Sequence, residues 1–154
     1  MLKINIDGAW NERSKRGGIG VVIRNDQGVF VAGLTKTFDH IGSPLVSEAL
    51  AAREGALLAT QRGFQNFMLQ SDSLQIVTTL NDPSINLSII GHINEDSKAL
   101  IASITRAIST YIRRQANGCA HWLARYALLS NFNCTWNGIP SDLILDPILK
   151  DVLL

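Results

Sequence analysis

The sequence predicts an α/β fold with a five-stranded mixed sheet, whose first three strands are antiparallel and whose later strands are parallel, flanked by helices. Two observations predict it: strand-like apolar runs come first without interruption, and helical patterns then separate the later runs. The 154 residues, 46% of them hydrophobic, are enough for one domain with a buried core. We therefore expect a single domain over 1–154, with its core in 1–130 and a tail in 131–154.

The first third of the chain predicts three strands. Residues 3–7 alternate polar and apolar side chains, as a strand with one buried face does. Residues 17–24 are rich in β-branched side chains, and 29–34 follow the turn formers of 25–28 as the returning strand of a hairpin. Two hairpins in succession make the third strand run in the direction of the first.

Helices and parallel strands are expected next. Ser43 and Pro44 supply an N-cap and a proline for the first turn of a helix that ends near Gly63. The remaining patterns predict a strand at 65–70, a helix capped at 71–73 and ending near 81–83, a helix at 89–101, a strand at 106–113 and a helix at 117–129. Right-handed crossovers make both later strands parallel to the first. The tail is expected to pack without regular structure before a last short helix.

Composition and charge exclude several classes of protein. No apolar run approaches the roughly 20 residues of a membrane span, so we expect no membrane contact. A strong nucleic-acid binder usually carries a basic face, and the net charge is only +1, so we expect any grip on nucleic acid to be local and weak. The spacing of Cys119 and Cys134 matches no metal-binding pair, and two such cysteines are typical of reduced thiols. The residues after Met1 have the pattern of a strand and not that of a signal peptide. We expect an intracellular monomer, nuclear or cytoplasmic and not secreted.

Four polar side chains are predicted to meet at one edge of the sheet. Asp7 ends the first strand, and Asp72 follows the fourth. Glu48 lies in the second turn of the helix that begins at that edge, and His121 lies near the start of the last helix. Ligands bind outside the carboxyl ends of parallel strands, so this edge is the candidate site.

Each of these residues has an ordinary structural alternative. Asp7 could end a strand at a turn, and Asp72 could cap a helix together with Gln75. Glu48 could be solvated, and His121 could be a surface histidine of its helix. The convergence of three carboxylates favours a shared site for them, and it favours a ligand role for His121 less.

Three converging carboxylates repel one another unless a cation binds between them. Oxygen ligands of this kind suit Mg²⁺ or Mn²⁺. Two such ions can activate a water and stabilise the leaving oxygen of an in-line displacement at a phosphodiester. The sequence therefore predicts a site for two divalent cations that cleaves a nucleic-acid backbone.

Ordered motifs around these residues cover nearly the whole chain. They read NIDGA at 5–9, GGIGVVIRN at 17–25, SEALAARE at 47–54, SDS at 71–73 and RQANGCAHWLA at 114–124, with Trp136 and Pro140 in the tail. Together they resemble type 1 ribonuclease H, and within that family the plant reverse-transcriptase-like branch.

The resemblance implies a metal-dependent endonuclease that hydrolyses the RNA strand of RNA–DNA hybrids and leaves a 3′-hydroxyl and a 5′-phosphate. It carries over Asp7, Glu48 and Asp72 as metal ligands and catalytic residues. Active members have an aspartate at the position of His121, whereas an imidazole adds no negative charge and prefers softer ions than Mg²⁺. We expect His121 to replace that carboxylate and to assist proton transfer.

Residues that could contact nucleic acid are few. Arg113, Arg114 and Asn117 are the candidates near the site. A second basic cluster is Arg13, Lys15 and Arg16, and each of these arginines and lysines could equally be an ordinary solvated residue. Trp10 and Trp122 could stack on bases or pack in the core.

The chain also departs from active members of the family. The asparagine pair that reads RNA 2′-hydroxyls is replaced by Pro44, Leu45 and Val46. The loop with glycine and histidine before the last helix is missing, and so is the basic handle of some members. These departures favour an alternative function, a catalytically weak or inactive ribonuclease H-like module that binds nucleic acid or protein.

Overall fold

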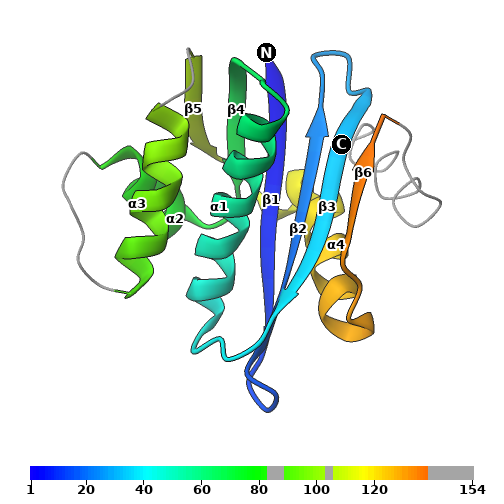
Figure 1. The fold of residues 1–154 in the computed structure, drawn as a ribbon, viewed down its shortest axis with the longest axis vertical. Coiled ribbons are helices and arrows are strands. Elements are labelled where there is room, and N and C mark those ends of the chain that lie inside the picture. Colours follow the sequence, from blue (N-terminus) through cyan, green and yellow to red (C-terminus); the bar gives the residue numbers. More distant parts are fainter. Residues whose placement is uncertain (83–88, 103–105, 139–154) are drawn as a thin grey trace.

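The computed structural model describes residues 1–82, 89–102 and 106–138 as a sheet with helices on both faces (Figure 1). The strands are β1 (Leu2–Asn11), β2 (Arg16–Arg24), β3 (Phe30–Phe38), β4 (Asn66–Ser71), β5 (Arg106–Tyr111) and β6 (Cys134–Asn137). The helices are α1 (Pro44–Gln61), α2 (Leu74–Asn81), α3 (Ile89–Ala102) and α4 (Gly118–Ser130), with a short 3₁₀ turn η1 (Arg114–Asn117) before α4. The predicted last short helix lies outside the described residues.

The sheet confirms the predicted mixed topology. Its strands lie in the order β5-β4-β1-β2-β3-β6. Strands β1, β2 and β3 form an antiparallel meander, and β4 and β5 run parallel to β1. The crossover helices therefore begin at the edge of the sheet where the parallel strands end.

The sixth strand corrects the prediction that the start of the tail has no regular structure. Strand β6 pairs antiparallel with β3, from Thr35↔Cys134 to Ala32↔Asn137. This pairing satisfies the open edge of β3, and Trp136 packs against the buried cluster that contains Val22 and Phe30. Four residues are too short to show a strand periodicity, so only the tertiary contact reveals this strand.

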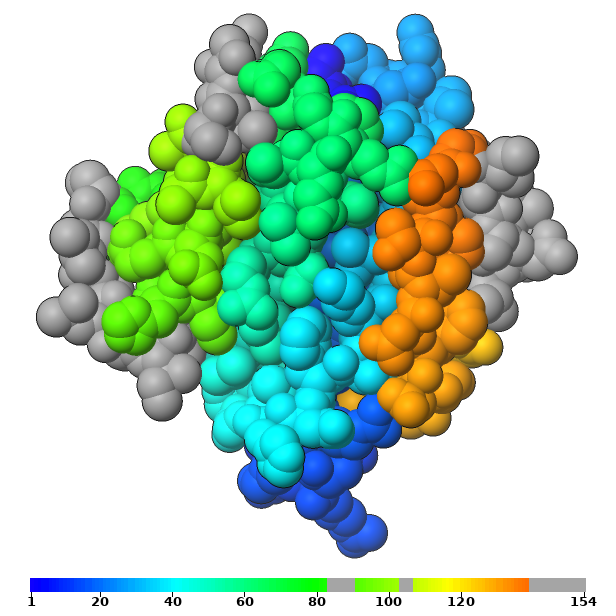
Figure 2. Space-filling view, viewed as in Figure 1, coloured from blue at the N-terminus to red at the C-terminus, as the bar shows by residue number. Residues whose placement is uncertain are grey.

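Two layers of helix cover the sheet. Figure 1 shows α1, α2 and α3 in front of it and α4 behind it. In Figure 2 the outer surfaces of α1 and α3 form much of the front face, and the β1–β2 hairpin protrudes below the body of the molecule. None of the helices in the described ranges is long and apolar enough to span a membrane.

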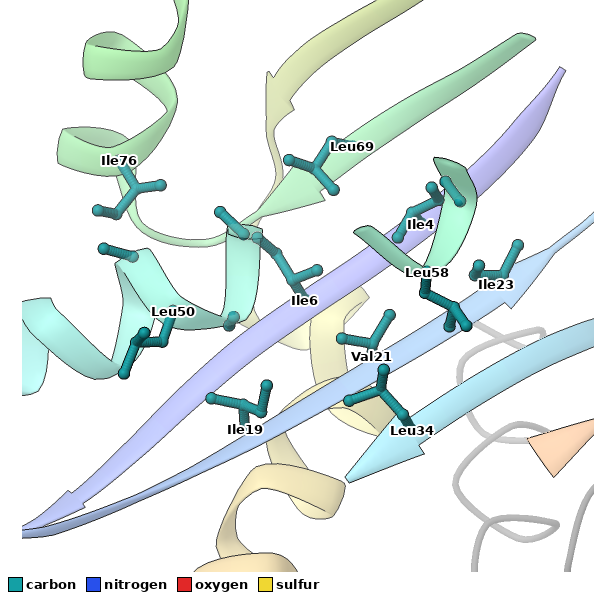
Figure 3. Packing of buried hydrophobic residues seen from close by; sticks show 14 of the residues in the cluster. Ile4, Ile6, Ile19, Val21, Ile23, Leu34, Leu50, Leu58, Leu69 and Ile76 are labelled. Atoms are coloured by element: carbon teal, nitrogen blue, oxygen red, sulfur yellow. The ribbon is translucent and has the colours of Figure 1, made fainter. Parts of the chain in front are cut away.

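The larger core lies between the sheet and α1. Its side chains include Ile4 and Ile6 from β1 and Ile19, Val21 and Ile23 from β2, which point towards Leu50 and Leu58 of α1 (Figure 3). The alternation of residues along these strands is what places them on one face.

The opposite face of the sheet carries the polar residues of β1 and a smaller core under α4. Helix α4 lies close to β2, because a Cβ at Gly20 would stand 2.4 Å from the carbonyl oxygen of Ala120. This close approach brings the first turn of α4, and with it His121, beside β1.

Candidate active site

Asp7 lies where the parallel part of the sheet ends. It pairs with Gly20 of β2, while β4 ends at Ser71, opposite Ile6. The side chain of Asp7 is buried and reaches past the end of β4. The predicted end of the first strand at Asp7 is wrong, because β1 continues to Asn11 as one arm of the long hairpin with β2. The position of Asp7 relative to β4 is nevertheless the predicted one.

Asp72 follows β4 directly and does not cap the next helix. The side chain of Ser73 caps α2 by accepting a hydrogen bond from the backbone N–H of Ile76. The carboxylate of Asp72 is therefore left for the site, where its Oδ2 accepts a hydrogen bond from Nε of Arg114 at 3.2 Å. Only 6% of the Asp72 side chain is exposed, compared with 66% of Arg114.

Glu48 is positioned by the start of α1 and by Gly8. Ser43 caps the helix by accepting a hydrogen bond from the N–H of Val46, which places Glu48 in the second turn. A Cβ on Gly8 would lie 2.5 Å from the carbonyl carbon of Ser47 and 2.7 Å from the nitrogen of Glu48, so a glycine is required for this approach. The backbone N–H of Gly8 in turn donates to the carboxyl of Glu48.

The three carboxyl groups form one cluster. One oxygen from each of Asp7, Glu48 and Asp72 lies within 4.8 Å of the others. Burial, followed by the charges of Asp7 and Asp72, raises the pKa of Glu48 from 4.5 to about 9. Burial, followed by the charge of Asp72, raises the pKa of Asp7 from 3.8 to about 6, although a hydrogen bond from His121 opposes this rise. At neutral pH the cluster therefore retains a proton, held mainly by Glu48.

His121 contacts the cluster from one side through Asp7. Its Nδ1 lies 2.7 Å from Oδ2 of Asp7, and 30% of its side chain is exposed. An ionised Asp7 accepts this hydrogen bond, so Nδ1 of His121 carries the hydrogen. The other ring nitrogen, Nε2, takes no part in this bond. His121 thus orients Asp7. It is not one of the three residues whose ligand atoms all lie within 4.8 Å of one another.

The donor set fits a divalent cation. Oδ1 of Asp7 and Oε2 of Glu48 are buried and, within the described part of the chain, have no hydrogen-bond partner apart from the proton that Glu48 shares with Asp7. A buried carboxylate oxygen without a donor is costly. An all-oxygen set of carboxylates is what Mg²⁺ and Mn²⁺ prefer, and a cation between these oxygens would satisfy both of them.

The predicted nucleic-acid contacts lie in different environments. Arg113 is exposed, whereas Arg114 pairs with Asp72. Asn117 is fully buried: its Nδ2 donates to the carbonyl of Ile6 at 2.8 Å, and its Oδ1 accepts from Nδ2 of Asn5 at 3.2 Å. The side chain of Asn117 therefore ties the start of α4 to β1, one residue before Asp7, and does not reach the surface.

Two of these positioning residues, Asn5 and Gly8, were missed as such by the sequence reasoning. The alternation of β1 could have indicated Asn5, because it places Asn5 on the same face as Asp7. No local signal separates the close approach at Gly8 from an ordinary turn glycine.

The hairpin cluster and the two tryptophans also have structural partners. Lys15 Nζ lies 5.0 Å from the centre of the Trp10 ring, and the indole N–H of Trp10 donates to the carbonyl of Ile41 at 2.8 Å. Arg16 pairs with Asp39 at 3.0 Å. Trp122 stacks on Tyr126 and packs against the smaller core.

Comparisons with known proteins agree with this geometry. The sequence model of the reverse transcriptase-like family matches residues 5–127. Comparison with curated protein sequences gave no match.

Solved structures resemble the fold over most of its length. RNase H1 from the halophilic archaeon Halobacterium salinarum NRC-1 has 21% identity and a TM-score of 0.77, covering 84% of this chain and 98% of its own. The N-terminal RNase H domain of Rv2228c from Mycobacterium tuberculosis has 18% identity and a TM-score of 0.76, covering 84% and 94%. LC11-RNase H1, solved in complex with an RNA/DNA hybrid, has 17% identity and a TM-score of 0.76, covering 85% and 99%. At these identities the likeness shows a ribonuclease H-like fold.

Proposed function

The chain belongs to the reverse transcriptase-like family of the ribonuclease H-like fold, and from this premise we propose that it is a metal-dependent endonuclease. Its substrate would be the RNA strand of RNA–DNA hybrids, as in type 1 ribonuclease H. The observation that carries the proposal is the buried cluster of Asp7, Glu48 and Asp72, with two carboxylate oxygens that lack a partner among the described residues. A purely structural position would not favour three buried carboxyl groups in one place.

The three carboxylates have distinct parts in holding Mg²⁺ or Mn²⁺. Asp7 and Asp72 would hold one ion, and Glu48 would help to hold the second. Bound ions of this kind lower the pKa of a water and balance the charge of the leaving oxygen. Arg114 reduces the repulsion at Asp72, and His121 fixes Asp7 so that Oδ1 is its oxygen without a protein donor.

Protons are held at two places in the site. Glu48, with a pKa of about 9, keeps its proton at neutral pH when no cation is bound, and a bound cation would take the place of this proton. His121 has Nδ1 bonded to Asp7, so Nε2 is the atom that could accept or donate a proton during the reaction. This is the assisting role proposed for His121 in place of a fourth carboxylate.

The hybrid as substrate is supported by a structural relative. LC11-RNase H1, with a TM-score of 0.76, is described in complex with an RNA/DNA hybrid. The net charge of +1 implies few phosphate contacts, so we expect the affinity to be modest and to fall only gently as salt rises.

A second function is favoured by a specific observation. The position of the fourth carboxylate is occupied by His121, which adds no negative charge and is bonded to Asp7. Pro44, Leu45 and Val46 supply none of the amide groups that read 2′-hydroxyls in the family. Both features suit a module that binds nucleic acid or protein and cleaves slowly or not at all.

A cleavage assay separates the two functions. Hybrid with a labelled RNA strand is incubated with the protein in Mg²⁺ or Mn²⁺, beside the isosteric variant Asp72→Asn. The nuclease predicts shortened RNA from the parent protein and none from Asp72→Asn. Hybrid that is bound but uncut in both metals would support the binding module, and equal cutting by Asp72→Asn would point to a contaminant. A gain of Mg²⁺-dependent rate in His121→Asp would identify the fourth position as the limiting one.

A further inference from the structure

A pocket of about 230 Å³ lies beside the carboxylate cluster, between the outer half of β1 and the exposed side of α4. Gly8, Ala9 and Asn11 line it on the strand side, and His121, Arg125 and Leu129 are among the residues on the helix side. The pocket adjoins the proposed metal site directly, because Gly8 bonds to Glu48 and His121 bonds to Asp7.

The charge of this pocket is positive. None of its lining residues is an aspartate or a glutamate, and Arg125 is its one permanently charged side chain. Arg125 is exposed and forms no ion pair within the described ranges, in contrast to Arg114 and Arg16, which pair with Asp72 and Asp39. An exposed arginine at a pocket wall without a carboxylate is suited to a phosphate.

The spacing relates Arg125 to the reaction centre. Arg125 follows His121 by four residues, so both side chains lie on one face of α4, about 6 Å apart along its axis. Phosphates of one nucleic-acid strand are spaced about 3.4 Å along the duplex axis. Arg125 therefore lies about one helical turn from His121, which contacts Asp7 of the carboxylate cluster, a separation comparable to the spacing of neighbouring phosphates.

The walls suit a stretch of nucleic-acid backbone. On the strand side, Gly8 offers only backbone, because its Cβ position faces α1, and Ala9 carries only a methyl group, so this wall leaves room for a chain to pass. Leu129 is 75% exposed and offers an apolar surface to a sugar or a base edge. The volume is below the roughly 300–1,000 Å³ of pockets that enclose a whole small molecule.

We propose that this pocket is a backbone subsite, in which Arg125 binds a phosphate that flanks the scissile one on the strand being cut. The inference rests on the proposed function, because it takes the carboxylate cluster as the place of cleavage. It gives the site a phosphate-binding residue on the side of His121, away from the Arg114–Asp72 pair.

Hybrid binding tests this subsite. Affinity for a fluorescently labelled RNA–DNA hybrid is measured by anisotropy over a range of salt in the Asp72→Asn background, where the proposed mechanism allows no cleavage. Arg125→Ala is expected to weaken binding about five- to tenfold and to reduce the slope of log K against log salt by about 0.9, the value for one phosphate contact. Arg125→Glu should reduce the slope further, and Arg125→Lys should retain it.

The matched control is Arg62→Ala. Arg62 is the C-cap of α1, about 21 Å from Glu48 along the helix axis, so this variant removes the same charge far from the pocket. Affinity and salt slope that are the same in Arg125→Ala as in Arg62→Ala would overturn the subsite while leaving the proposed function in place. A parent protein that binds no hybrid at any salt would overturn both. Thermal unfolding of each variant checks that the fold is retained.

Discussion

At the scale of single residues, the ionisation of the acidic cluster decides what the site can bind. Glu48 and Asp7 are buried near one another and near Asp72, so each added negative charge raises the cost of the next. The protein without a cation reduces this cost by keeping a proton on Glu48. A divalent cation replaces that proton, so cation binding and proton release are linked at this site.

This linkage predicts how stability depends on pH. The pKa of Glu48 rises from 4.5 in the unfolded chain to about 9 in the folded protein, so between these values the folded state holds a proton that the unfolded state has lost. Its contribution to stability is thus complete below about pH 4.5 and is lost as pH rises towards 9. We expect the unfolding midpoint in EDTA to fall over this range more steeply for the parent protein than for Glu48→Gln.

Urea unfolding of both proteins, with EDTA and with excess Mg²⁺, measures this difference. Mg²⁺ at about 100 times its dissociation constant should add about 2.7 kcal/mol to the parent protein's free energy of unfolding. At one fixed Mg²⁺ concentration the addition should be larger at pH 8 than at pH 6, because the ionised cluster binds the cation more tightly. Identical pH profiles for the parent protein and Glu48→Gln would show that Glu48 does not carry the proton.

The predicted site residues show what can be inferred at this scale. The sequence order of strands and helices was enough to bring Asp7, Glu48 and Asp72 to one edge, because topology alone fixes which strand ends meet. The partners of the flanking polar residues were not predictable. Arg114 bonds to Asp72 and Asn117 is buried, and both outcomes depend on how η1 packs on β1.

At the scale of elements, the contact between β1 and α1 determines where Glu48 stands. The backbone of α1 packs so closely against Gly8 that a Cβ at this position would overlap with the backbone of Ser47. The N-cap at Ser43 sets the first turn of α1, and Gly8 sets its distance from the sheet. Displacement of this helix would move Glu48 away from Asp7 without changing any ligand.

Gly8→Ala tests this contact. The added methyl group would stand 2.5 Å from the backbone of Ser47, so α1 must shift, and we expect a loss of about 1–3 kcal/mol of unfolding free energy. We also expect the stabilisation by Mg²⁺ to shrink, because Glu48 moves with the helix. Gly42→Ala is the control, since nothing lies within 4 Å of a Cβ there. Equal stability and equal Mg²⁺ response in the two variants would contradict the role of Gly8.

Strands and helices were predictable where burial of one face gives the sequence a regular spacing of apolar residues. Strands β2 and β4 and helix α1 were expected within one or two residues of their observed bounds, because their apolar residues face the sheet core at regular intervals. The extension of β1 beyond Gly8 and the strand β6 were not expected. Both exist through pairing with a neighbouring strand, to which the local pattern contributes little.

At the scale of the whole molecule, one face of the sheet forms the larger core and the other face carries the polar residues of the site. One face packs Ile4, Ile6 and Ile19 against α1 and forms the larger core. The other carries Asn5 and Asp7 and is covered by α4 on one side, which leaves the carboxylates at the margin of that helix. The cluster is therefore supported by a rigid sheet and lies next to an open pocket.

Diffraction at the manganese absorption edge tests most directly whether Asp7, Glu48 and Asp72 together bind a divalent cation. Crystals grown or soaked with Mn²⁺ should show anomalous peaks between the three carboxylates, one bonded to Asp7 and Asp72 and a second bonded to Glu48. Nδ1 of His121 should still contact Asp7, and the peak at Asp72 should weaken or vanish in Asp72→Asn. A saturated crystal with no peak between these carboxylates, or with manganese bound only elsewhere, would contradict the assignment of this edge as a metal centre.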